Sequence, residues 1–178
     1  MRFIETQLQG AFIIEPKVYK DNRGFFVETH NSRVFKDNGI DSCFVQDNYS
    51  FSKNKGVVRG LHLQRSPHEQ SKLVWVVSGS VLDVIVDIRK GSPTFGKWVS
   101  YELNSSELKM IYVPKGFAHG FCTLEDNTHV LYKVDSFYAP DADTGLLWND
   151  EDLAITWPVK DPVLSEKDKG LPRFKDLM

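Results

Sequence analysis

The residues best suited to chemistry gather around His62. Arg59 and His62 belong to one expected strand, separated by Gly60-Leu61, and Lys72 opens the next strand. An imidazole can accept a proton near neutral pH as a general base. An arginine fork suits a diphosphate, whereas a lysine ammonium suits a developing oxyanion. A single Arg or Lys is more often a solvated surface cation, so it is the clustering around His62 that predicts a site.

Tyr132 and Asp168 each have two explanations. Tyr132 shares a strand face with Val130, and it is either a barrel aromatic with a satisfied hydroxyl or a phenol that protonates a carbanion. Asp168 ends Ser165-Glu166-Lys167-Asp168, which matches a capping box. In that role its carboxylate bonds a backbone amide at a helix start. The same carboxylate could instead orient and stabilise His62 as a catalytic dyad does.

The two histidine segments resemble the halves of the cupin signature. His119 ends Pro114-Lys115-Gly116-Phe117-Ala118-His119, and residues 57–61 separate Gly56 from His62. The cupin pattern has a second histidine where this chain has Gln64. A cupin metal site needs about three imidazoles and a carboxylate, so an amide here weakens metal binding. We therefore expect no metal, and the absence of a Gly-x-Gly-x-x-Gly element predicts no nicotinamide, so that no cofactor is expected.

The elements that must position these residues are mostly strands. Between Phe25 and Val134, short β-branched and aromatic runs alternate with Gly, Pro, Asn and Ser, which is typical of a sandwich or barrel. We expect residues 1–178 to form one mainly β domain, a cupin-type jelly-roll β-barrel with a few short helices. The barrel would span about residues 25–135, with short N- and C-terminal extensions packed on it. A chain of 178 residues with 41% apolar content can bury one such core.

Turn and cap signals give the local expectations. Leu73–Val77 and Val81–Asp87, joined by Ser78-Gly79-Ser80, predict a hairpin in the barrel wall. In its second strand, alternation places Asp83 and Asp87 on one face with Val81 and Ile85, and one face must be core. Short helices are expected over residues 31–38 and from Ser165.

Composition excludes several partners. A net charge of −2, with 22 basic and 24 acidic residues, gives no basic face for nucleic acid or an anionic membrane. Neither a signal-peptide core nor an apolar run of membrane-spanning length is present, so we expect a cytoplasmic protein. Cys43 and Cys122 lack metal-type spacing and are expected to be buried, reduced thiols.

With these residues assembled, nearly the whole chain resembles the dTDP-4-dehydrorhamnose 3,5-epimerases. The resemblance is dense and collinear. It is carried by Asp21-Asn22-Arg23-Gly24-Phe25-Phe26-Val27-Glu28, Phe44-Val45-Gln46-Asp47-Asn48, Val58-Arg59-Gly60-Leu61-His62, Lys72-Leu73-Val74, residues 87–96, residues 114–121, Leu131-Tyr132-Lys133, Tyr138-Ala139-Pro140 and Leu164-Ser165-Glu166-Lys167-Asp168.

The resemblance implies a role for each site residue. His62 would be the general base, paired with Asp168, and Tyr132 the general acid on the opposite face of the sugar. Lys72 would stabilise an enolate oxygen. Substrate contacts are implied for Arg23, Glu28, Gln46, Asp47, Asn48, Arg59, Lys72, His119, Tyr138, Asp143 and Lys167. Tyr138 would pack near the pyranose, and the N-terminal segment with Arg23 would reach the neighbouring site of a homodimer.

The implied substrate is dTDP-4-dehydro-6-deoxy-D-glucose, epimerised at carbons 3 and 5 to dTDP-4-dehydro-L-rhamnose. Both carbons adjoin the carbon-4 ketone, so enolate formation acidifies their protons, and one base and one acid suffice. The chain departs from the family at Leu63 (usually Tyr), Ser71 (often Gly), Asp143 (usually Glu) and residues 144–148, which lack the usual basic residues. These departures leave open a single-centre epimerase on a related 4-keto sugar. A third reading is a non-catalytic or metal-dependent sugar-binding cupin.

Overall fold

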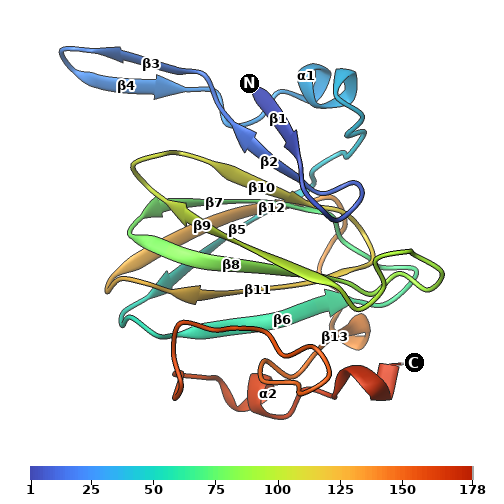
Figure 1. Cartoon of the computed structure of the whole chain (residues 1–178). Helices are drawn as coiled ribbons and strands as arrows, with labels where there is room; N and C mark the ends of the chain where they lie inside the picture. The colour runs from blue at the N-terminus through green and yellow to red at the C-terminus, as the bar shows by residue number, and fades with distance from the viewer. Residues whose placement is uncertain (178) are drawn as a thin grey trace.

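Two antiparallel sheets face each other in this computed structural model, which describes residues 1–177 (Figure 1). The first contains, in spatial order, β1 (Arg2–Glu5), β2 (Phe12–Glu15), β10 (Met110–Val113), β7 (Lys72–Ser78), β12 (Thr128–Val134) and β5 (Gln46–Ser52). The second contains β13 (Asp143–Gly145), β6 (Val58–Gln64), β11 (Phe117–Thr123), β8 (Ser80–Asp87) and β9 (Trp98–Asn104). This arrangement confirms the predicted mainly β barrel.

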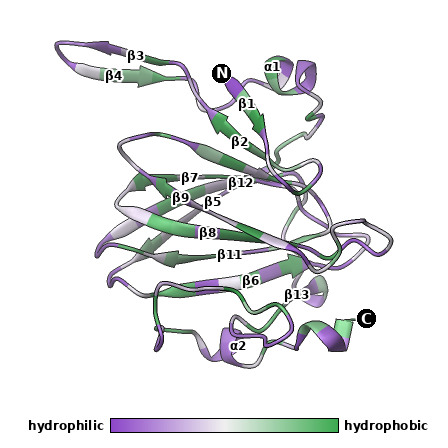
Figure 2. Ribbon diagram, viewed as in Figure 1, coloured by the Kyte–Doolittle hydropathy of each residue, from purple (hydrophilic) through white to green (hydrophobic). Residues whose placement is uncertain are grey.

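The space between the sheets is filled by apolar side chains toward one end. The strands that form it are mainly hydrophobic in Figure 2, whereas α2 (Glu166–Lys169) is hydrophilic. The buried cluster between the sheets includes Ile13, Val74, Val76, Val81, Ile85, Ile111, Val113, Phe117, Phe121 and Val130. Burial of this set stabilises the barrel and leaves its other end for polar residues.

The predicted hairpin between β7 and β8 is wrong, although both strands are present. β7 pairs with β10 and β12 in one sheet, whereas β8 pairs with β9 and β11 in the other. Gly79, at a φ of +82°, is the point at which the chain crosses between the sheets. A Cβ there would lie 2.4 Å from Oγ1 of Thr128. The tight glycine turn was predicted correctly, but it makes a barrel corner instead of a hairpin.

Both faces of β8 are buried, whereas alternation led us to expect one. Val81 and Ile85 point into the barrel, and Val84 and Val86 belong to a second apolar cluster with Leu146, Leu153 and others. The C-terminal segment, orange to red in Figure 1, supplies several of the side chains in this second cluster, among them Ile155, Trp157 and Phe174. Asp83 and Asp87 lie on the inner face with Val81 and Ile85, and both are fully buried acidic residues.

Both helix predictions are confirmed at their caps. α1 (Ser32–Asp37) begins after Asn31, whose side chain accepts hydrogen bonds from the backbone of Arg33 and Val34. Ser165 caps α2 in the same way, accepting from the backbone N–H of Asp168. Two 3₁₀ turns, η1 (Pro140–Ala142) and η2 (Phe174–Leu177), complete the short helical elements.

The N-terminal boundary of the barrel differs from the expectation. β3 (Val18–Asp21) and β4 (Gly24–Val27) form a separate two-stranded arm that projects away from the barrel in Figure 1. We call residues 18–27 the N-terminal arm. β1 and β2 belong to the first sheet and β13 to the second, although all three lie outside residues 25–135, so the barrel extends beyond the predicted bounds at both ends.

None of the helices within residues 1–177 is long and apolar enough to cross a membrane. Cys122 is buried, as expected, but the prediction for Cys43 is wrong: it is exposed, and it lies in residues 41–45, which form no strand.

Candidate active site

The adjacent strands β6 and β11 place three of the predicted site residues, Arg59, His62 and His119, in one sheet. His62 on β6 lies directly opposite His119 on β11, and the register then shifts so that Phe121 pairs with Arg59. Glycines allow this close fit: a Cβ on Gly60, which has a φ of +119°, would lie 2.6 Å from the Cα of Gly120. Larger residues would push β6 away from β11, so the Arg59-Gly60-Leu61-His62 spacing is part of the site's architecture.

The opposite sheet supplies Lys72 and Tyr132. Lys72 begins β7 and Tyr132 lies on the neighbouring strand β12. Beside them runs β5, whose alternation sends Gln46, Asn48 and other small polar side chains inward. The two histidines and the Lys72–Tyr132 pair therefore face each other across the barrel mouth.

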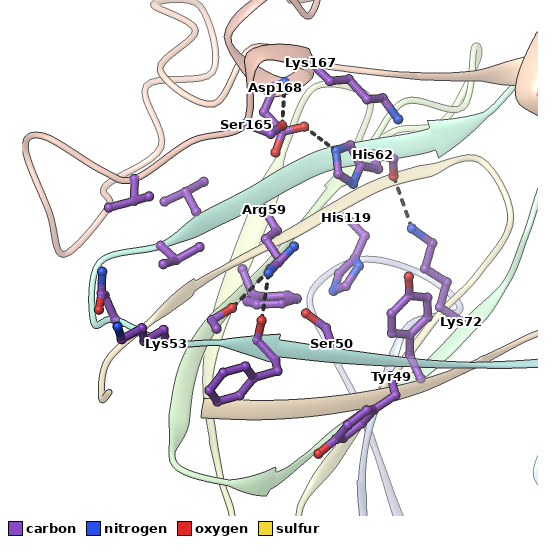
Figure 3. A pocket seen from close by; sticks show the side chains of 18 residues that line it. Tyr49, Ser50, Lys53, Arg59, His62, Lys72, His119, Ser165, Lys167 and Asp168 are labelled. Atoms are coloured by element: carbon purple, nitrogen blue, oxygen red, sulfur yellow. Dashed lines mark hydrogen bonds and ion pairs between the residues drawn. The ribbon is translucent and has the colours of Figure 1, made fainter. Parts of the chain in front are cut away.

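A cavity of about 670 Å³ lies between these groups (Figure 3). Its chemically active lining residues are Arg59, His62, Lys72, His119, Tyr132, Ser165, Lys167 and Asp168. A second hollow of about 360 Å³ shares His62, Lys72, Tyr132 and Lys167 with the first and adds Gln46, Asn48, Tyr138 and Asp143. An elongated ligand could therefore extend across both hollows with its reactive part beside His62 and Tyr132.

Asp168 pairs with His62 through its carboxylate and takes part in the helix cap only through its backbone, so the capping-box role predicted for the carboxylate is wrong. Its backbone N–H donates to Ser165 Oγ at 3.1 Å, which is the cap, but its carboxylate does not return to the helix start. Oδ1 instead accepts a hydrogen bond from His62 Nε2 at 2.6 Å (Figure 3). Burial raises the pKa of the Asp168 carboxyl, but the hydrogen bond and charge of His62 outweigh it and leave that pKa below its usual value. The pair is thus a carboxylate–imidazole dyad.

Lys72 is a buried ammonium beside His62. Its Nζ donates to the backbone carbonyl of His62 at 3.3 Å. Burial lowers its pKa from the usual 10.5 to about 8, and the charges of Asp83 and Asp143 oppose that fall. A cation held here in a poorly hydrated site suits the stabilisation of a negative oxygen.

Tyr132 keeps its proton at neutral pH. Burial raises the pKa of its phenol, and the positive charge of Arg59 opposes the rise only in part. A protonated phenol in the cavity can serve as an acid.

Tyr138, Asp143 and Lys167 form one cluster at the second hollow. The Tyr138 hydroxyl donates to Asp143 Oδ2 at 2.8 Å, and Lys167 forms an ion pair with the same oxygen. Gln46 accepts a hydrogen bond from the backbone of Tyr138 at 3.1 Å. These contacts place an exposed aromatic ring at the entrance to the hollow.

Gln64 occupies the position of the missing cupin histidine and acts as a structural amide. Its Nε2 donates to the carbonyl oxygens of His68 and Phe137, and its Oε1 accepts from the backbone of Ala139. No cluster of three or more His, Cys, Asp or Glu side chains within residues 1–177 could hold a metal ion. The residues present thus do not fit a cupin metal centre.

Three predicted contact residues lie outside both hollows of this chain. Arg23 is at the turn of the N-terminal arm, where it pairs with Asp21, and Glu28 follows the arm directly. Asp47 points to the outer face of β5 and pairs with Lys133 at 2.8 Å. Their side chains are not brought together with His62.

Two residues at the site were missed by the sequence reasoning. Asp83 accepts a hydrogen bond from His119 Nε2 at 2.8 Å, although its strand position had been noted only for its alternation. Ser50 lines the cavity with a buried hydroxyl that lacks a hydrogen-bond partner among residues 1–177. The run of polar residues at every second position of β5 was the available signal for Ser50.

Known proteins are similar to the chain over nearly its full length. The family model described as dTDP-4-dehydrorhamnose 3,5-epimerase matches residues 5–176. A relative with that description from Shigella flexneri is 49% identical and covers 99% of this chain and 97% of its own length.

Solved structures give the same result for the fold. The enzyme of that description from Bacillus anthracis, solved with TDP and PPi bound, is 50% identical with a TM-score of 0.95, covering 97% of this chain and 99% of its own. A Legionella pneumophila dTDP-6-deoxy-D-glucose-3,5-epimerase, in complex with dTDP-4-keto-L-rhamnose, is 44% identical. Its TM-score is 0.93, and the match covers 99% of this chain and 96% of the other.

Proposed function

This chain belongs to the dTDP-4-dehydrorhamnose 3,5-epimerase family, and from that premise we propose how it inverts carbons 3 and 5 of dTDP-4-dehydro-6-deoxy-D-glucose. His62 is the base, Tyr132 the acid and Lys72 the enolate-stabilising cation. One observation carries this assignment: His62 and Tyr132 come from opposite sheets and line the same cavity. Inversion requires a proton to leave one face of the ring and arrive on the other, which this placement supports.

The dyad leaves His62 ready to accept a proton. Its Nε2 donates to Asp168, so in the neutral imidazole Nδ1 carries the free lone pair. That nitrogen takes the proton from the carbon next to the ketone, and the Asp168 carboxylate stabilises the imidazolium that forms. Negative charge moves to the carbon-4 oxygen beside the Lys72 ammonium, and the Tyr132 phenol then protonates the carbanion from the other face.

Substrate binding is assigned to the cations and amides around this centre. Arg59 and Lys167 are the cations for the diphosphate, and His119, Gln46 and Asn48 supply polar contacts. Tyr138 and Asp143 edge the second hollow, where an aromatic face can pack on a ring of the ligand. Arg59 is held in place by donation to Ser52 Oγ and to the backbone oxygen of Phe51.

We assign Arg23 and Glu28 to the neighbouring site of a homodimer. The arm that carries Arg23 projects from its own barrel and exposes 57% of Phe25 and 70% of Phe26. Aromatic side chains this exposed favour a protein partner, and a two-fold dimer would let each arm serve the other subunit. Asp47 stays in the proposal as a substrate contact because the family resemblance implies it, although its side chain pairs with Lys133 in this chain. The cytoplasmic location stays a prediction.

Mixing variants tests the exchanged arm. Arg23→Ala and His62→Ala subunits should each be poor catalysts at limiting substrate. If Arg23 acts across the dimer, a mixed dimer has one site with both residues intact. Random one-to-one mixing should then restore about a quarter of wild-type activity. Activity that stays at the sum of the two separate variants contradicts the exchange.

Hydrogen exchange in deuterium oxide tests the reaction itself. With dTDP-4-dehydro-6-deoxy-D-glucose, the enzyme should introduce deuterium at carbons 3 and 5 and invert both, which proton NMR of the sugar can follow. Inversion at one carbon alone indicates the single-centre alternative. No exchange at either carbon indicates a binding protein. Activity that a chelator removes and a divalent ion restores indicates a metal-dependent cupin.

Asp168→Asn and Ser165→Ala separate the two roles found at α2. Asp168→Asn should lower kcat strongly, because an amide orients His62 less well and cannot balance an imidazolium charge. Ser165→Ala loses the cap and should lower the free energy of unfolding by about 1 kcal/mol with a much smaller effect on rate. Steady-state kinetics and thermal unfolding on both variants make the comparison. Equal kcat losses in the two variants would show that Asp168 is only part of the helix start.

A further inference from the structure

A second histidine–carboxylate pair lies beside the His62–Asp168 dyad. Asp83 on β8 is 0% exposed, and its Oδ2 accepts a hydrogen bond from His119 Nε2 at 2.8 Å. Its other oxygen, Oδ1, is buried without a hydrogen-bond partner among residues 1–177. The second carboxylate on β8, Asp87, differs: Arg89, Ser92 and Thr94 all donate to it.

A half-satisfied buried carboxylate is costly. An unpaired charged oxygen in the interior loses hydration that nothing in the fold replaces, so such a group destabilises the protein unless it acts on its neighbours. Two functional side chains interact with the negative charge of Asp83. His119 bonds it directly, and Lys72 on the opposite sheet gains electrostatic stabilisation from it.

We infer that Asp83 is a positioning residue for the epimerisation: it fixes the tautomer of His119 through their hydrogen bond and keeps Lys72 in its ammonium form. This inference rests on the proposed function, in which Lys72 stabilises the enolate and His119 contacts the substrate. Asp83 does not line either hollow, so it acts only through these two residues.

The effect on His119 follows from its burial. Burial lowers the pKa of His119, the charge and hydrogen bond of Asp83 oppose this, and the charges of Lys72 and His62 lower it further. The net direction is downward, so the imidazole is neutral at physiological pH. Its single proton then lies on Nε2, where it is donated to Asp83. Nδ1 is left as an acceptor for a hydroxyl group of the ligand, since it has no partner within residues 1–177.

The effect on Lys72 is electrostatic. Its pKa of about 8 reflects burial first, then the stabilising charges of Asp83 on β8 and Asp143 on β13, and the repulsion of Lys167 on α2. The same cavity also places His62 and His119 on the facing sheet, Tyr132 on the neighbouring strand β12, and Arg59 and Asp168 around Lys72. The ammonium is present below about pH 8 and is lost above it, so kcat/KM of the free enzyme should fall as pH rises through that value.

Asp83→Asn removes the charge with little change of shape. The alkaline limb of the kcat/KM profile should then move to lower pH, because the negative charge of Asp83 raises the pKa of Lys72 and its loss lowers that pKa. The matched control is Asp87→Asn, which removes an equally buried carboxylate from the same strand. This control should lose stability and leave the alkaline limb where it is in the wild type.

A second measurement uses the wild-type protein and therefore does not depend on whether Asp83→Asn folds. Nitrogen-15 NMR of the wild-type histidines, with His119 assigned from a His119→Gln protein, should show the proton of His119 on Nε2. The reverse tautomer, or an Asp83→Asn profile that coincides with the wild type, overturns the inference. The test is separate from that of the proposed function, which fails if the wild-type enzyme exchanges no substrate protons, whatever the state of His119.

Discussion

His62→Ala should stop proton exchange and product formation together. Without the imidazole, the cavity loses the base assigned to the proton next to the ketone, so carbons 3 and 5 should both stay unlabelled in deuterium oxide. Removal of a positioned base typically costs about a hundredfold to ten-thousandfold in rate, and we expect a loss of kcat of that size or larger. NMR detection of the labelled sugar and a coupled kinetic assay would measure the two effects.

The fold should survive this change. The His62 side chain is 34% exposed, so its truncation opens the cavity wall without emptying the apolar core. His68→Ala is the matched control, because that histidine is exposed and lines neither hollow. It should retain wild-type exchange. Wild-type exchange in His62→Ala itself would show that another group is the base.

Much of this site could be predicted because its parts are close in the sequence. Arg59 and His62 share a strand, so the sequence placed them close together. An i, i+3 pair on a regular strand would point to opposite faces, and both line the cavity because the register of β6 and β11 shifts between them, which the spacing did not predict. The caps at Asn31 and Ser165 also follow local rules, since each needs only one polar side chain before a helix. Asp168 was left between two roles because the cap is local and the bond to His62 spans 106 residues.

Features set by distant parts of the chain were missed. A glycine turn at Gly79 is compatible with a hairpin or a corner, and only the partners of β7 and β8 decide between them. The burial of both faces of β8 depends on the C-terminal segment, which no alternation in the strand could reveal. The role of Asp83 could not be predicted from its own strand, because its contact with His119 depends on the pairing of β8 with β11.

Tyr132→Phe should separate inversion from exchange. The base remains, so protons should still leave carbons 3 and 5, and the His62 imidazolium can return a proton to the face from which it came. Protonation of the carbanion from the opposite face of the ring no longer has its acid. A positioned acid typically contributes about a hundredfold to ten-thousandfold, so inversion should fall by that factor while exchange falls much less.

The phenylalanine variant should be well folded, because it keeps the ring that packs against the barrel core and loses only a hydroxyl facing the cavity. Tyr101→Phe is the matched control: burial raises the pKa of that phenol too, but Tyr101 lines neither hollow. It should keep both exchange and inversion. If Tyr132→Phe inverts the sugar at the wild-type rate, the phenol is an ordinary barrel aromatic. If exchange and inversion instead fall by the same factor, proton removal itself needs Tyr132, and the division of labour between the two faces is wrong.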